Sequence, residues 1–253
     1  MPSTVLYDAG GHRNILIEEA LAGESEVETN QHLIIHHDGA IILDPGGHNV
    51  YARVLAETGK QLGRSRLEAI LLSHQDPDVV AAINGWLVAS EATAYVSQLW
   101  LRFVPHFGLD RLVVSRLRGI PDEGMILDLR GCKLLFVPAH FLHSPGNFHV
   151  YDPVSHILYT GDLGASMGTP EREVRDFEAH RAYMEPFHRR YMASNRALRA
   201  WVRMVRQLDV EIVAPQHGAM FVGKRMVDRF LAWLETLETG VDVVEPLFRL
   251  PEH

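Results

Sequence analysis

The sequence predicts a layered α/β fold. Short aliphatic and β-branched runs, typical of buried strands, alternate with longer amphipathic runs typical of helices. Several strand-like runs end at a histidine or an aspartate, and in α/β folds sites are built on the loops after strands. With 253 residues, 47% of them hydrophobic, the chain can bury a sizeable core, and we expect residues 1–253 to form a single domain.

The first quarter of the chain reads as strands followed by a helix. Strands are expected at 14–18, 32–37 and 40–43, and Asp38-Gly39 is a strong signal for a hairpin turn. The acidic turn 44–47 then leads to a helix over 49–62, which ends near Gly63.

A short apolar run at 67–72 predicts a buried strand that stops at one histidine and two aspartates. His74, Asp76 and Asp78 follow it directly, and a buried helix is expected at 79–88. A purely structural interpretation stays open here, because Asp76-Pro77 is also a good helix start, with aspartate as N-cap and proline in the first turn.

The rest of the chain continues the alternation. Helices are expected at 98–107, interrupted around Pro105, within 177–207, interrupted near Pro186, and at 224–237. Five further strands are expected, at 94–97, 133–137, 148–151, 157–160 and 210–214.

Composition excludes some classes of protein. The net charge of −8 argues against nonspecific binding to nucleic acid or to an anionic membrane. A signal peptide and a membrane-spanning run are both absent from the sequence, so we expect a cytoplasmic protein. The single cysteine, Cys132, excludes an internal disulfide and a thiolate-rich metal site, and we interpret it as a packing residue.

Histidine or aspartate follows the end of a strand-like run at four places. Each residue alone could be an ordinary loop residue, but histidine and carboxylate are also the ligands of hard and borderline divalent metals. Six of them would suffice for two ions, and the carboxylate of Asp162 could bridge the two. The candidate ligands are His74, Asp76, Asp78, His143, Asp162 and His217.

Five motifs in order along the chain resemble those of the metallo-β-lactamase superfamily. They are ILDPG at 42–46, LSHQDPDV at 72–79, HSPGN at 143–147, TGD at 160–162 and PQHG at 215–218. The resemblance covers most of the chain. It implies an αββα sandwich with a dinuclear metal site at one edge of its two sheets.

Two departures from this family pattern bear on function. Where zinc hydrolases carry HxHxDH, Asp76 replaces the second histidine and Val79 replaces the last one. Three carboxylates against two divalent ions leave about one net positive charge, and oxygen-rich ligation favours iron over zinc. A similar change, HxExD, marks the flavodiiron proteins, which the C-terminal half also resembles.

The resemblance assigns ligands to each metal. His74, Asp76, His143 and Asp162 would hold metal 1, and Asp78, Asp162 and His217 would hold metal 2. Val79 would leave metal 2 an open position for O2 or NO.

Three further residues are interpreted individually. Asp44 is expected either to hydrogen-bond a ligand histidine or to be a plain turn residue. His140 could donate a hydrogen bond to a ligand, but we favour a partly exposed loop residue. Tyr191 could approach the metals, but we favour a core tyrosine.

The resemblance is to stand-alone oxygen-binding diiron proteins, because too few residues follow His217 for a flavodoxin domain. This implies two iron ions, no FMN in this chain, and an external redox partner such as a rubredoxin-like protein or a flavoprotein. A homodimer is compatible with it. The alternative is a metallohydrolase with two zinc ions acting on a thioester, lactone or phosphodiester. A metal-bearing partner module without turnover is the third interpretation.

Overall fold

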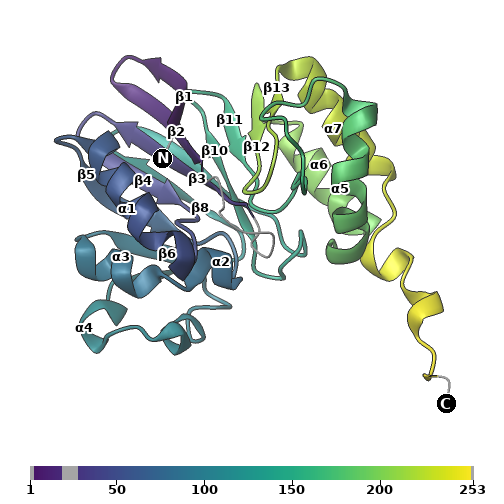
Figure 1. The fold of residues 1–253 in the computed structure, drawn as a ribbon, viewed down its shortest axis with the longest axis horizontal. Helices are drawn as coiled ribbons and strands as arrows, with labels where there is room; N and C mark the ends of the chain where they lie inside the picture. The colour runs from purple at the N-terminus through teal and green to yellow at the C-terminus, as the bar shows by residue number, and fades with distance from the viewer. Residues whose placement is uncertain (1–2, 19–27, 252–253) are drawn as a thin grey trace.

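The computed structural model describes residues 3–18 and 28–251. Two mixed β-sheets pack face to face, and helices cover both outer faces, which gives the order helix, sheet, sheet, helix (Figure 1). This is the predicted αββα sandwich.

The first sheet contains seven strands in chain order, so each strand pairs with its neighbour in the sequence. The strands pair antiparallel up to β4 and parallel from there to β7. The predicted hairpin between β3 and β4 is present, with its turn at His37 and Asp38, one residue earlier than expected. The strands are β1 (Ser3–Ala9), β2 (His12–Glu18), β3 (Asn30–His36), β4 (Gly39–Leu43), β5 (Arg66–Leu71), β6 (Thr93–Ser97) and β7 (Leu117–Ile120).

The second sheet contains six strands in the order β13-β12-β11-β10-β9-β8. Only β11 and β12 pair in parallel, and the remaining neighbours are antiparallel. The strands are β8 (Met125–Leu129), β9 (Cys132–Pro138), β10 (Phe148–Asp152), β11 (Ile157–Tyr159), β12 (Ile212–Ala214) and β13 (Phe221–Val222).

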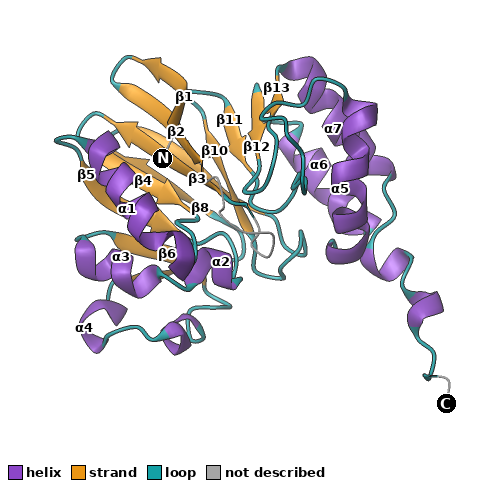
Figure 2. Cartoon of the chain, in the orientation of Figure 1, coloured by secondary structure: helices purple, strands orange, loops and turns teal. Residues whose placement is uncertain are grey.

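The helices divide between the two outer faces (Figure 2). The first sheet is covered by α1 (His48–Leu62), α2 (Pro77–Val80), α3 (Ile83–Ala89) and α4 (Arg111–Val114). The second is covered by α5 (Phe177–Tyr191), α6 (Asn195–Val205) and α7 (Lys224–Thr236). Across the described ranges, every helix is too short or too polar to cross a membrane.

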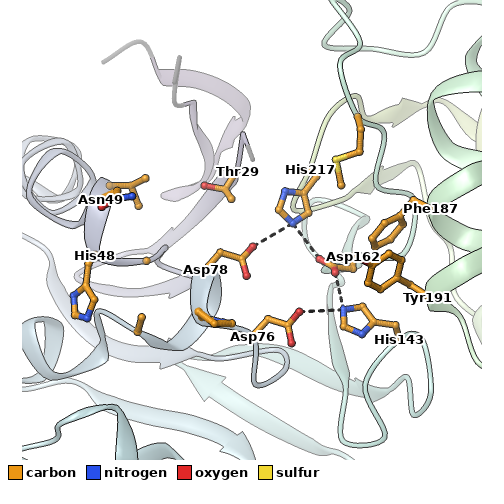
Figure 3. Close-up of a pocket in the computed structure, with 15 residues that line it drawn as sticks. Thr29, His48, Asn49, Asp76, Asp78, His143, Asp162, Phe187, Tyr191 and His217 are labelled. Carbon is orange, nitrogen blue, oxygen red and sulfur yellow. Dashed lines mark hydrogen bonds and ion pairs between the residues drawn. The ribbon is translucent and has the colours of Figure 1, made fainter. Parts of the chain in front are cut away.

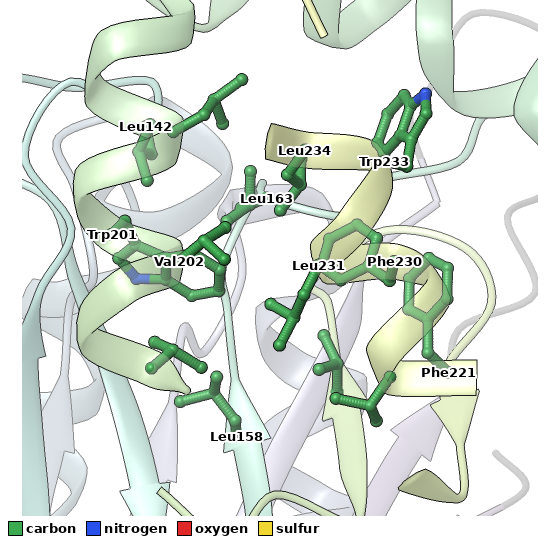
Figure 4. Packing of buried hydrophobic residues seen from close by; sticks show 14 of the residues in the cluster. Leu142, Leu158, Leu163, Trp201, Val202, Phe221, Phe230, Leu231, Trp233 and Leu234 are labelled. Carbon is green, nitrogen blue, oxygen red and sulfur yellow. The ribbon is translucent and has the colours of Figure 1, made fainter. Parts of the chain in front are cut away.

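Three buried clusters separate the four layers. Ile34, Leu71, Phe136 and Phe148 belong to the cluster between the sheets, which also contains Cys132, as predicted. A second cluster lies beneath α1, α2 and α3. The third lies under α5, α6 and α7, where Phe230 stacks on Phe221 and packs beside Trp233 (Figure 4).

Several predicted elements differ in the structure. The helix expected at 79–88 is divided into α2 and α3, because Ala82 leaves the helical region at φ −91° and ψ 4°. Most of 98–107 forms turns, with a 3-10 helix only at Val104–Phe107. Helix α5 runs through Pro186, and the break falls after Tyr191 instead, because buried residues on both sides of the proline hold α5 against the core. Strands β1, β7, β8 and β13 were not predicted.

Candidate metal centre

The loop after β5 carries the candidate ligands His74 and Asp76, and the first turn of α2 carries Asp78. Asp76 is the N-cap of α2 and Pro77 is at N1, as the structural interpretation expected, but the Asp76 carboxylate makes no capping hydrogen bond. The side chain is therefore free to face the site. The backbone N–H of Phe148 donates to the Ser73 carbonyl at 3.0 Å, which ties this loop to the second sheet.

The other candidate ligands follow strands of the second sheet. His143 lies on the loop between β9 and β10, Asp162 follows β11, and His217 follows β12. Gly161, with a φ of 50°, makes the turn that places Asp162 directly after its strand. All six predicted side chains meet at one edge of the two sheets, and Figure 3 shows most of them around the pocket.

Four of these side chains form a compact first set, with one ligand atom from each lying within 4.8 Å of the others: His74, Asp76, His143 and Asp162. The Asp162 Oδ2 atom lies 2.8 Å from His143 Nε2 and 3.7 Å from His74 Nε2.

The second set is organised by His217. Its Nε2 atom lies 3.4 Å from Asp78 Oδ2 and 3.2 Å from Asp162 Oδ1. Asp162 thus turns one oxygen to each set. This is the geometry that a carboxylate bridging two metal ions requires.

The pKa values of the site follow from carboxylates and histidines that lie close together in a buried space. Burial alone would raise the pKa of Asp162, but His74, His143 and His217 together hold it well below its usual range. Burial lowers the pKa of His143 and His217, yet the facing carboxylates outweigh it and raise these pKa values to about 9 and about 10. The carboxylates of the site therefore stabilise the protonated forms of His143 and His217, which face them.

Two buried atoms indicate that the set fits metal ions. Among the described residues, His74 Nε2 and Asp162 Oδ1 have no hydrogen-bond partner, although both face the centre. Buried polar atoms are rarely left unpaired, and a cation between these groups would satisfy both. Three histidines and three carboxylates suit a hard or borderline divalent ion such as iron.

Neighbouring groups orient two of the three histidines, His217 and His74, through their Nδ1 atoms. The His217 N–H donates to the Glu28 carbonyl at 2.7 Å, and His74 Nδ1 lies 2.8 Å from Ser73 Oγ. Asp44 does not reach a ligand histidine directly: its Oδ1 accepts from the Ser73 backbone N–H at 2.8 Å. Asp44 acts on His74 through Ser73. This role is neither the direct hydrogen bond to a ligand histidine nor the plain turn role that the sequence left open.

The centre opens into a pocket of about 770 Å³. Phe187 and Tyr191 of α5 line one wall, and Thr29, His48 and Asn49 line the opposite side (Figure 3). The prediction that Tyr191 is a core residue was wrong. It is 55% exposed, stacks on Phe187, and its ring lies 5.7 Å from that of His143.

His140 stays outside the centre, and its Nε2–H donates to the Asp122 carbonyl at 2.8 Å, which agrees with its interpretation as a loop residue. Sequence reasoning missed Ser73, which contacts His74, and Phe187, which lines the pocket. The sequence shows that these residues lie next to a ligand or one turn from Tyr191. The orientation of their side chains, however, depends on loops that are distant in the sequence.

Val79 is fully buried in the cluster beneath α1 to α3 and is not among the residues that line the pocket. We expect Val79→His to lower the free energy of unfolding by about 1–3 kcal/mol, because the imidazole would be buried without a partner. Metal content should stay unchanged. Urea unfolding and metal analysis test this, with Val79→Ile as control. A gain of bound zinc at unchanged stability would show instead that position 79 reaches the metals.

The fold and the site together define a metallo-β-lactamase-like αββα sandwich with a histidine and carboxylate centre at the edge of its sheets. The model of the family described as ODP family beta lactamase matches residues 27–218, more than half of the chain, so the chain belongs to this family.

Solved structures extend this comparison. A structure described as a peroxy diiron species of the chemotaxis sensor ODP is 39% identical, with a TM-score of 0.88, and the match covers 98% of this chain and 100% of that one. The apo state of the chemotaxis sensor ODP from T. denticola is 40% identical, with a TM-score of 0.85 over 98% of this chain and 99% of that one.

More distant relatives are larger proteins. The Flv1 flavodiiron core from Synechocystis sp. PCC6803 is 18% identical with a TM-score of 0.73, over 92% of this chain and 60% of that one, and shares the fold. A Synechocystis protein named as a diflavin flavoprotein (A 2) is 28% identical over 166 residues, which are 61% of this chain and only 27% of that protein.

Proposed function

We propose that this chain is a non-haem diiron protein that binds O2 or NO. The observation that carries the proposal is Asp162, a buried carboxylate that turns one oxygen to each of two ligand sets. Relatives of 39% and 40% identity over nearly the whole chain are described as a chemotaxis sensor, one of them as a diiron species. They support a sensor more than a hydrolase.

The proposed ligands divide as the two sets do. His74, Asp76, His143 and Asp162 would hold the first iron, and Asp78, Asp162 and His217 the second. Two iron ions there would supply redox chemistry and a position for a diatomic ligand, since sites that bind exogenous ligands keep fewer protein ligands than structural sites.

The chain's own residues would shape that position. Phe187 and Tyr191 form an aromatic wall beside His143, and the pocket is open to solvent beyond them. Without a bound flavin, turnover would need an external electron donor, for which we propose a rubredoxin-like protein or a flavoprotein. Without one, the protein would act as a sensor.

The test is anaerobic loading with Fe(II), followed by exposure to O2 or NO. We expect two irons per chain and near-ultraviolet and visible absorption on exposure. Protein grown with both metals that holds two zincs and no iron, stays colourless and hydrolyses a generic ester or phosphodiester would favour the metallohydrolase instead.

His74→Ala should remove the first metal and abolish this absorption, because His74 Nε2 is a fully buried donor of the first set. Metal analysis and the same spectrum measure the effect. The matched control is His106→Ala, an exposed histidine on the 3-10 turn at Val104–Phe107, which should keep both metals and the spectrum. An unchanged iron content in His74→Ala would contradict the ligand assignment.

A further inference from the structure

The two oxygens of Asp76 have different environments. Oδ2 faces the centre, 3.4 Å from His143 Nε2 and 3.8 Å from His74 Nε2. Oδ1 faces away from these histidines and accepts a hydrogen bond from the Gln75 side-chain amide at 2.9 Å. The carboxylate is therefore held so that one oxygen is offered to the first metal.

Gln75 is itself anchored on the opposite loop. Its Oε1 atom accepts from the Ser144 hydroxyl, and the Ser144 oxygen accepts from the Trp100 indole N–H at 3.2 Å. Ser144 is buried and directly follows His143. Gly146 leaves no space between this loop and Trp100, since a Cβ there would lie 2.8 Å from the indole nitrogen. The network thus connects the loop of Asp76 to the loop of His143.

The position of Asp76 would also suit a different side-chain orientation, which this network opposes. Asp76 occupies the N-cap of α2, where an aspartate side chain usually accepts from the N–H groups of the first turn. The side chain is one third exposed, so burial does not hold it in one rotamer. The hydrogen bond from Gln75 opposes rotation toward the helix, because the carboxylate would have to give it up.

We propose that Gln75 is a positioning residue that keeps Asp76 turned away from its helix cap as a one-oxygen ligand of the first metal, with Ser144 and Trp100 fixing Gln75. The inference rests on the proposed metal centre. It also explains how the short aspartate arm is held in place from a partly exposed loop.

The test is Co(II) binding, followed by its visible absorption and by competition with a chelator. We expect wild-type protein to bind two Co(II). Gln75→Leu should weaken binding at the first position by about 10-fold or more, as is usual when a group that orients a ligand is removed. Ser144→Ala should produce a smaller loss in the same direction, because Gln75 would keep its bond to Asp76.

A double-mutant comparison separates this role from a general structural one. In an Asp76→Ala background, Gln75→Leu should cause no further loss of Co(II) affinity, because its effect passes through that carboxylate. Gln207→Leu, a matched change of an exposed glutamine beyond α6, should leave Co(II) binding unchanged. Circular dichroism of the metal-free variants checks that all of them fold.

The outcomes distinguish the two proposals. Wild-type protein that binds no metal would overturn the metal centre itself. If wild-type protein binds two Co(II), and Gln75→Leu binds Co(II) at the first position with an affinity within two-fold of wild type, only the role of Gln75 would be overturned. Losses that add in the double variant would likewise exclude action through Asp76.

Discussion

Asp162→Ala is expected to remove both metal ions, which no other single ligand replacement should do. Asp162 is the side chain shared by the two ligand sets, with Oδ2 2.8 Å from His143 and Oδ1 3.2 Å from His217. Without it, the first set would lose one of four groups and the second would fall from three to two. We therefore expect metal content to fall from two ions per chain to well below one.

Metal analysis of the purified variants after Fe(II) loading measures this effect. Asp78→Ala serves as the matched comparison, since His217 is the one candidate ligand that pairs with Asp78, and this variant should lose only the second ion. Asp162→Asn keeps the size of the side chain and separates the loss of charge from the loss of volume. Retention of one tightly bound ion in Asp162→Ala would contradict a bridging role.

The candidate ligands could be predicted because their signals are local. Each histidine or aspartate follows a strand within a few residues, and the ends of β5, β11 and β12 lie at one edge of the sandwich. The six side chains therefore meet in the structure, although their role as metal ligands stays a prediction. The metallo-β-lactamase resemblance supplied their division into two sets, which agrees with the two directions of the Asp162 oxygens.

The surroundings of the site could not be predicted in the same way. Gln75 and Ser144 are 69 positions apart, and their contact exists only because two loops from different sheets approach each other. Tyr191 has the apolar ring of a core residue, but it is the last residue of α5 and lies at the pocket mouth. Tertiary packing also decided the course of α5 through Pro186, against local propensity.

A buried contact between His12 and Asp152 could not be predicted from the sequence either. Its removal has the largest expected effect on stability. These residues are 140 positions apart, on different sheets, with His12 Nε2 2.7 Å from Asp152 Oδ2. That oxygen also accepts from Asn14 Nδ2 at 2.7 Å and from the Ser155 hydroxyl at 2.8 Å. Asp152→Ala would leave three buried donors without this acceptor. We expect it to lower the free energy of unfolding by about 3–5 kcal/mol at neutral pH.

The effect should depend on pH in a defined direction. Burial alone would raise the pKa of Asp152, but hydrogen bonds from His12 and Asn14 outweigh it and lower the pKa to about 2. An unfolded aspartate titrates near pH ~3.9. A carboxyl whose pKa is lower in the folded state stabilises the fold above its unfolded pKa, and this contribution is lost as pH falls through the folded value. The stability difference between wild type and Asp152→Ala should therefore narrow between about pH 4 and pH 2.

Guanidinium unfolding at several pH values measures both the size and the pH dependence of this effect. The matched control is Asp209→Ala, because Asp209 pairs with Lys224 at 2.7 Å on the exposed surface, where solvent screens the interaction. That variant should unfold almost as wild type does. If Asp152→Ala were equally mild, or if its effect were the same at pH 2 and pH 7, the ionised carboxylate of Asp152 would not be what holds the two sheets together at this point.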